Sequence, residues 1–116
     1  MASPSRTVLV VDDDGSIRLL CRLNLELEGC RVLEAASIAQ AREQLAGEHV
    51  DVVLLDVHVG FDNGVEFMHE LRRLYPDLKV ALLTGSDRVD GSGSDAVIPK
   101  PFRLEQLTST VANLAG

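Results

Sequence analysis

Four charged residues stand at positions in the sequence from which they could act together on a phosphoryl group. Asp12 and Asp13 directly follow one apolar run, Asp56 follows a second, and Lys100 follows a third. Three carboxylates at one point repel one another unless a cation joins them. Oxygen ligands of this kind suit Mg²⁺, which keeps several of its waters and binds phosphate groups. The pattern therefore predicts a pocket for Mg²⁺ in which Asp56 accepts a phosphoryl group, while Lys100 and the Thr84 hydroxyl hold phosphoryl oxygens.

The apolar runs in front of these residues predict buried strands. Runs 8–11, 52–55 and 80–83 are continuously apolar rather than alternating. This is typical of parallel strands that helices cover on both faces. Ligands of such sheets bind beyond the carboxyl ends of the strands, where the acidic residues and Thr84 stand.

The rest of the chain alternates between extended and helical patterns. The sequence predicts strands over 7–12, 31–35, 51–55, 79–83 and 96–98, and helices over 15–28, 37–46, 64–74 and 103–114. Segment 57–63 is predicted to be a loop. Segment 84–95 is rich in Gly, Ser and Asp, so we expect a flexible loop there, and also a flexible N-terminal segment over 1–6.

Local signals mark where the first two helices begin and end. Asp14 is expected to cap the first helix, and Gly29 can end it in a left-handed conformation. Ser37 begins the second helix with Gln40 three positions later, which is a capping-box pattern, and Gly47 stops that helix.

Length and composition narrow the range of functions. The chain has 116 residues, the size of a single domain over 1–116. Its net charge of -7 disfavours direct binding to nucleic acid or to anionic membranes. The sequence has no run fit to span a bilayer and no signal-peptide pattern, so a cytoplasmic location is expected. Cys21 and Cys30 are predicted to be reduced and mostly buried thiols.

Five motifs, taken together, point to one protein family. They are Val-Leu-Val-Val-Asp12-Asp13-Asp14, Val-Val-Leu-Leu-Asp56, Gly64 eight positions later, Leu-Leu-Thr84-Gly85 and Pro-Lys100-Pro101-Phe102. In this order they resemble the receiver domain of a bacterial two-component response regulator. The resemblance covers almost the whole chain, and the combination is far more specific than any one motif.

This resemblance implies a fold and a phosphodonor. The fold would be α/β and flavodoxin-like, a doubly wound five-stranded parallel sheet with strand order 2-1-3-4-5. Asp56 would receive its phosphoryl group from a sensor histidine kinase or a histidine phosphotransfer protein. The domain would catalyse only its own phosphorylation and dephosphorylation. The Lys100–Pro101 peptide bond would be cis.

The resemblance also implies a role for each site residue. Asp13 and Asp56 would bind Mg²⁺ directly, and Asp12 mainly through water. The backbone carbonyl of His58 would complete the metal site. Thr84 and Lys100 would move to the phosphoryl group.

Three departures from the family pattern affect the expected switch. Gly60 stands where members commonly have proline, so that loop should be more mobile. Val97 replaces the usual switch aromatic. Only 16 positions lead from Thr84 to Lys100, so the fourth helix is expected to be shortened or absent. Signalling is therefore predicted to act through ordering of segment 84–95.

Two other functions stay open. The chain could be a receiver-like interaction module that is never phosphorylated. It could also be a haloacid-dehalogenase-like phosphatase, since Asp12 and Asp14 form an Asp-x-Asp motif with Asp12 as nucleophile, although Asp56 would then have no role. A homodimer is a further association that the sequence leaves open.

Overall fold

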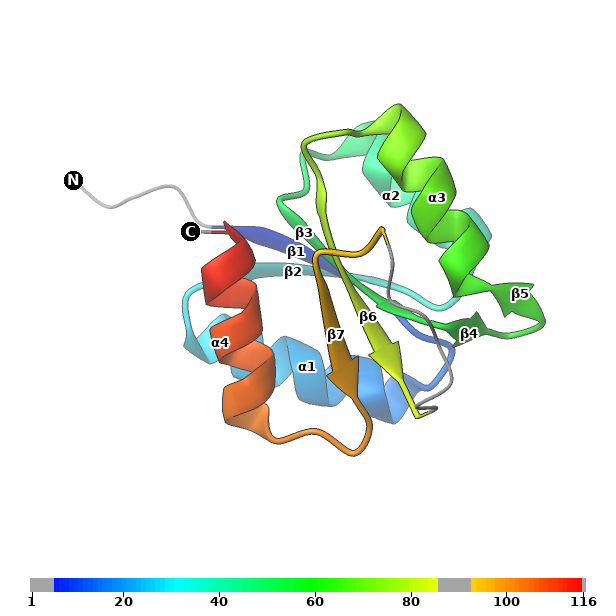
Figure 1. Ribbon diagram of the computed structural model, residues 1–116. Helices are drawn as coiled ribbons and strands as arrows, with labels where there is room; N and C mark the ends of the chain where they lie inside the picture. Colours follow the sequence, from blue (N-terminus) through cyan, green and yellow to red (C-terminus); the bar gives the residue numbers. More distant parts are fainter. Residues whose placement is uncertain (1–5, 86–92, 116) are drawn as a thin grey trace.

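A five-stranded parallel sheet lies between two pairs of helices (Figure 1). The structure is a computed structural model that describes residues 6–85 and 93–115. Its elements are β1 (Thr7–Val11), α1 (Gly15–Leu27), β2 (Arg31–Ala35), α2 (Ile38–Gly47), β3 (Val52–Asp56), β4 (His58–Val59), β5 (Asp62–Asn63), α3 (Gly64–Leu74), β6 (Lys79–Thr84), β7 (Ala96–Pro99) and α4 (Leu104–Ala115).

The sheet has the predicted topology. Its order is β2-β1-β3-β6-β7, so β6 and β7 are the fourth and fifth strands of the predicted order 2-1-3-4-5. Val11 pairs with Leu55, which pairs with Leu82, so the central strands end nearly level with one another. The side chains that follow these strands therefore meet at one edge of the sheet.

The apolar strands fill two cores, one on each face of the sheet. Leu9, Val53 and Leu82 belong to the core beneath α2 and α3. Val10 and Leu54 belong to the core beneath α1 and α4. Successive strand residues point to opposite faces, so a continuously apolar strand is needed to supply both cores.

The predicted caps are present at both helix starts. The Asp14 side chain accepts a hydrogen bond from the Ser16 N–H, and the Ser37 side chain accepts one from the Gln40 N–H. Gly29 follows α1 with a φ of 87°, a conformation that glycine adopts more readily than other residues. The first two helices therefore begin and end within one residue of the predicted bounds, with Gly47 the last residue of α2 rather than the residue after it.

The prediction of a plain loop over 57–63 is wrong. Strands β4 and β5 form a two-stranded antiparallel hairpin in which His58 pairs with Asn63 and Val59 with Asp62. The Val59 side chain is buried, and Gly60 has a φ of 62° in the turn. The hairpin depends on this tertiary anchor, which the short sequence between β3 and α3 does not reveal.

Between β6 and β7 the structure describes only Gly85 and residues 93–95, and none of these is helical. This agrees with the expectation that the family's fourth helix is shortened or absent. Residues 86–92, which carry most of the predicted loop over 84–95, lie outside the described part of the chain, as do residues 1–5 of the predicted N-terminal segment. In the described part, no helix combines the length and apolar character needed to cross a bilayer.

Arg72 of α3 ties down the return of the chain to β7. Its guanidinium donates hydrogen bonds to the Gly93 carbonyl at 2.7 Å, to the Leu78 carbonyl at 2.8 Å and to the Asp95 carboxylate. Asp95 also accepts from the Val80 N–H at 2.8 Å. Burial raises the pKa of Asp95, but these hydrogen bonds outweigh it and leave the pKa below its ordinary value. One arginine thus joins α3, the start of β6 and the approach to β7.

We expect Arg72→Lys to lower the free energy of unfolding by about 1–3 kcal/mol, because an ammonium cannot reach all three acceptors. Arg73→Lys, at the exposed neighbouring position, is the matched control and should change little. Urea unfolding measures the free energy of unfolding of both variants.

Because the pKa of Asp95 is lowered, its ionised form stabilises the fold above the ordinary Asp pKa, and this contribution is lost as pH falls through the lowered value. The Arg72→Lys deficit should shrink there, and a constant deficit would contradict the assignment.

Candidate functional site

Three carboxylates converge at the carboxyl edge of the sheet. Asp12 follows β1, Asp13 comes next, and Asp56 ends β3. One oxygen from each lies within 4.8 Å of the others. Asp12 has no exposed surface, and the Asp56 side chain is 14% exposed. Asp13 is exposed. The cluster therefore has a buried floor and an open side, which suits a site that must admit a ligand.

Lys100 joins the two most buried carboxylates. Its Nζ lies 3.0 Å from Asp12 Oδ2 and 3.0 Å from Asp56 Oδ2. Its backbone N–H donates to the Thr84 carbonyl at 2.6 Å, and the Lys100–Pro101 peptide bond is cis, as predicted. The fold thus brings Lys100 into direct contact with Asp56 and Asp12, which lie 44 and 88 positions before it in the sequence.

The electrostatics of the site reflect burial and crowding. Burial raises the pKa of Asp12, and the neighbouring Asp56 charge adds to this, while hydrogen bonds from the Asp14 N–H and from Lys100 oppose it; the pKa ends above its ordinary value. Burial lowers the pKa of Lys100, but its hydrogen bonds to Asp12 and Asp56 outweigh that effect and raise it. Lys100 is therefore protonated at neutral pH and forms ion pairs with both carboxylates.

A backbone amide holds each carboxylate. Asp12 Oδ1 accepts from the Asp14 N–H at 2.9 Å, and Asp56 Oδ1 accepts from the His58 N–H at 3.2 Å. Asp13 Oδ2 accepts from the Gly60 N–H at 3.2 Å. Proline at position 60 could neither make this bond nor adopt the positive φ. Gly60 therefore contributes a hydrogen bond to Asp13 that the proline common at this position in the family could not make.

Gly64 allows the start of α3 to approach the end of β3 closely. A Cβ built at Gly64 would lie 2.0 Å from the Asp56 carbonyl oxygen. The Gly64 N–H also donates to the Val57 carbonyl at 2.7 Å. The atoms that this Cβ would meet belong to the backbone of Asp56 and Val57, which cannot rotate away as a side chain could. The glycine eight positions after Asp56 is thus required by close contact between two backbones.

We expect Gly64→Ala to lower the free energy of unfolding by about 1–3 kcal/mol or more, since overpacking against backbone must displace α3 or Asp56. Gly47→Ala is the matched control, because nothing lies within 4 Å of a Cβ at that helix terminus. It should be neutral or slightly stabilising. Thermal unfolding followed by circular dichroism compares the two variants, and equal melting temperatures would contradict the close-approach argument.

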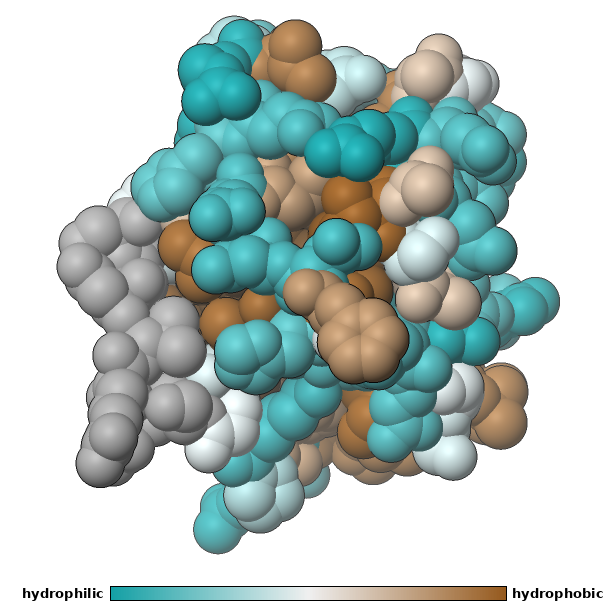
Figure 2. Space-filling view, turned by 90° about the vertical axis from the view of Figure 1, so that its right-hand side faces the viewer, coloured by the Kyte–Doolittle hydropathy of each residue, from teal (hydrophilic) through white to brown (hydrophobic). Residues whose placement is uncertain are grey.

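The remaining predicted site residues lie at the same edge of the sheet. Thr84 ends β6 and is buried, and the His58 side chain is exposed. Sequence reasoning missed Phe61, whose side chain is fully exposed at 109% in the turn of the β4–β5 hairpin. A lone phenylalanine among turn residues was the available signal. Figure 2 views the molecule from the side of this hairpin, where hydrophilic residues predominate.

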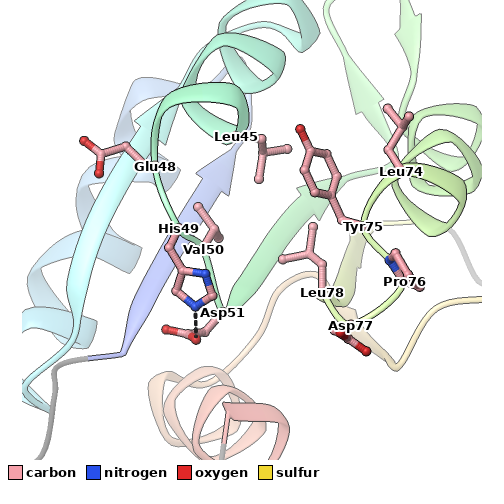
Figure 3. Close-up of a pocket in the computed structure, with 10 residues that line it drawn as sticks. All are labelled: Leu45, Glu48, His49, Val50, Asp51, Leu74, Tyr75, Pro76, Asp77 and Leu78. Atoms are coloured by element: carbon pink, nitrogen blue, oxygen red, sulfur yellow. Dashed lines mark hydrogen bonds and ion pairs between the residues drawn. The ribbon is translucent and has the colours of Figure 1, made fainter.

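Figure 3 shows a pocket, lined by apolar and acidic residues, that is separate from the acidic cluster. That pocket, of about 520 Å³, lies where the chain enters β3 and β6, at the opposite edge of the sheet. Leu45, Tyr75 and Leu78 provide apolar walls, and His49 hydrogen-bonds to Asp51 at 3.0 Å. Asp12, Asp13 and Asp56 do not line this pocket, so the candidate site is the acidic cluster at the carboxyl edge of the sheet.

Comparison with known proteins decides the family. The family model described as "Response regulator receiver domain" matches residues 8–112. The chain belongs to this family. It is 36% identical over 113 aligned positions to the response regulator MprA of Mycobacterium ulcerans and 35% identical to that of Mycobacterium avium, covering 92% of this chain in each case. The chain spans about half the length of these curated relatives, 49% and 50%.

Solved structures agree with this assignment. A response regulator from Thermotoga maritima is 31% identical with a TM-score of 0.85, covering 97% of this chain and 98% of that one. The chemotaxis response regulator CheY4 of Vibrio cholerae is 27% identical with a TM-score of 0.87, covering 96% and 99%. The chain is therefore a receiver domain with a phosphoacceptor signalling role rather than a conventional enzyme. Its family implies interaction with a histidine kinase or phosphotransfer protein.

The residues present fit a magnesium ion. Asp12, Asp13 and Asp56 offer hard oxygen ligands from one small volume, the type of ligand that Mg²⁺ prefers. When bound, the ion would neutralise the carboxylates and the oxygens of an incoming phosphoryl group.

We expect Mg²⁺ to raise the melting temperature of the wild-type protein, because a ligand that binds only the folded state adds about 2.7 kcal/mol at a hundred times its Kd. Asp13→Asn should lose most of this shift. Asp77→Asn, an exposed acid at the opposite edge, should keep it. Differential scanning fluorimetry over a Mg²⁺ series tests this, and an equal shift in all three proteins would place the ion elsewhere.

Proposed function

We propose that Asp56 accepts a phosphoryl group, with the help of Mg²⁺, from a phosphohistidine on a sensor kinase or phosphotransfer protein. The contact of Lys100 Nζ with both Asp12 and Asp56 at 3.0 Å carries this proposal. It supplies a protonated amine beside a partly exposed carboxylate, at the open edge of a sheet. Phosphoryl transfer requires little beyond such positioning and charge stabilisation.

In the proposed transfer, an Asp56 carboxylate oxygen forms a bond to phosphorus as the bond from phosphorus to the histidine nitrogen breaks. The electron pair of that bond stays on the imidazole, which takes a proton from solvent. Asp13, Asp56 and the His58 carbonyl would hold Mg²⁺ directly and Asp12 through water, and the ion would supply positive charge to the carboxylates and the phosphoryl oxygens. Lys100 and the Thr84 hydroxyl contact the phosphoryl oxygens.

The same contacts suggest how the signal leaves the site. Phosphorylation of Asp56 adds negative charge where Lys100 is now shared between two carboxylates. The ammonium group is drawn toward the phosphoryl oxygens, and the Lys100 N–H transmits this to the Thr84 carbonyl at the end of β6. Val97 is half-exposed on β7, in place of an aromatic switch residue, so coupling passes through the backbone at these two strand ends and alters partner contacts.

The geometry favours Asp56 over Asp12 as the acceptor. Both oxygens of each residue accept hydrogen bonds, but Asp12 is fully buried, whereas the Asp56 side chain is 14% exposed. A nucleophile must be reachable by its substrate, which argues against the phosphatase alternative. The alternative of a module that is never phosphorylated loses support because acceptor, lysine and acidic cluster all converge. A cytoplasmic location stays a prediction from the sequence.

We expect acetyl phosphate with Mg²⁺ to add one phosphoryl group to the wild-type protein, detected by intact-mass spectrometry. Asp56→Asn should abolish the adduct, and Asp77→Asn should retain it. Lys100→Ala should reduce its yield at least tenfold, since the phosphoryl oxygens lose their positive partner. Reduction with borohydride followed by peptide mapping locates the acyl phosphate. Labelling at Asp12 would favour the phosphatase, and no adduct in any protein would favour the non-phosphorylated module.

A further inference from the structure

The β4–β5 hairpin closes with a two-residue turn that favours glycine at position 60. Gly60 and Phe61 stand between Val59 and Asp62, which pair with each other across the hairpin. Gly60 has a φ of 62°, whereas the φ of Phe61 is not positive. A positive φ at only the first of two turn residues is typical of a type II′ turn, which has glycine at that position. The turn thus sets the backbone conformation of Gly60.

Contacts outside the acidic cluster hold this hairpin in place. The Val59 side chain is buried in the core beneath α2 and α3. Asn63 ends β5 and caps α3, because its side chain accepts hydrogen bonds from the N–H groups of Val65 at 2.9 Å and of Glu66 at 3.3 Å. The backbone N–H groups of the hairpin therefore have positions set by the core and by α3 rather than by the carboxylates.

The outer edge of β4 faces two of the three carboxylates. In a hairpin closed by two residues, the strand pair beside the turn is hydrogen-bonded, and the next pair directs its N–H groups outward. The outward His58 N–H donates to Asp56 Oδ1 at 3.2 Å. The Gly60 N–H, two residues further on, donates to Asp13 Oδ2 at 3.2 Å. An edge strand normally leaves such groups unpaired. Here one strand edge holds two acids that follow different strands of the main sheet.

We propose that Gly60 is a positioning residue for Mg²⁺ binding, because its N–H holds Asp13 Oδ2 in place and leaves Oδ1 to the ion. The inference rests on the proposed function, in which Asp13 is a direct ligand. Asp13 is exposed, and among the described residues Gly60 is the only hydrogen-bond partner of its side chain. Without this bond, the carboxylate would turn among several rotamers and would lose that freedom when the ion binds. Partners of this kind orient metal ligands and raise metal affinity.

This positioning depends on the departure of the chain from its family. A glycine in place of the common proline predicts a more mobile loop, but in this fold the glycine ties the loop to the metal site. Proline has no N–H and holds φ near -65°, so it can form neither the hydrogen bond nor this turn. Asparagine keeps the N–H and is among the residues that tolerate a positive φ. The hydrogen bond and the freedom of glycine can therefore be separated by substitution.

Amide exchange in the metal-free protein tests the hydrogen bond itself. With EDTA present, we expect Asp13→Ala to speed exchange of the Gly60 N–H with water about tenfold or more, as for the loss of one hydrogen bond to a charged group. Asp62→Ala removes an exposed carboxylate from the hairpin and should leave that rate nearly unchanged, which controls for the loss of a negative charge. NMR measures the rates. A Gly60 N–H that exchanges equally fast in wild type and Asp13→Ala would overturn the proposal.

Calorimetric titration of the full chain with MgCl₂ tests the effect on the ion. We expect Gly60→Pro to weaken Mg²⁺ binding about tenfold or more, as is usual when the partner of a metal ligand is lost. Gly60→Asn retains the N–H and should bind Mg²⁺ nearly as tightly as wild type. Equal losses in both variants would assign the effect to the turn instead of the N–H and would overturn the proposal, as would an unchanged affinity in Gly60→Pro.

Two features keep these outcomes decisive. Circular dichroism and thermal melting report whether Gly60→Pro keeps the fold, and the exchange rates in Asp13→Ala decide the hydrogen bond without that variant. None of the measurements requires phosphorylation. Acetyl phosphate that labels Asp56 while Mg²⁺ binding ignores position 60 contradicts this inference alone. Mg²⁺ binding that depends on Gly60, in a protein that accepts no phosphoryl group, contradicts the proposed function alone.

Discussion

The contact of one lysine with two carboxylates governs the functional edge of this protein. Asp12 is fully buried, and a buried carboxylate is costly unless it is paired and hydrogen-bonded. Lys100 supplies that pairing and at the same time contacts Asp56, which is open to solvent on one side. Two carboxylates share one ammonium while Asp13 stands nearby, so the site retains excess negative charge. That excess negative charge suits a divalent cation, which would also offset the charge of a phosphoryl group.

The fold holds the three carboxylates and Lys100 within a few ångströms of one another. Parallel strands in near-level register bring Asp12, Asp56 and Thr84 to a common edge, and β7 returns Lys100 to the same place. Gly64 lets the start of α3 touch the Asp56 backbone where a side chain would not fit. Backbone amides of 14, 58 and 60 then fix the three carboxylates. These hydrogen bonds restrict the rotation of each carboxylate and keep the three charges close together.

The molecule departs from its family where signals usually leave a receiver domain. No helix occupies the described residues between β6 and β7, where Arg72 donates hydrogen bonds to Gly93 and Asp95. Val97 cannot act as an aromatic switch. Meanwhile α1 presents an outer row of leucines on the opposite face of the sheet from α3.

The sequence by itself determined the fold class, because its continuous apolar runs favour parallel strands covered on both faces. The strand order and the roles of the acidic and basic residues were predicted from the resemblance of its motifs to receiver domains. Asp14, Ser37 and Gly29 carry local capping signals that need no distant contact. Tertiary structure decided what local pattern cannot encode. The β4–β5 hairpin depends on burial of Val59, and the Asp13 hydrogen bond to Gly60 depends on loops 47 positions apart. The exposure of the α1 leucines also came only from the packed structure, because a helix with apolar residues all round does not reveal which face the sheet will cover.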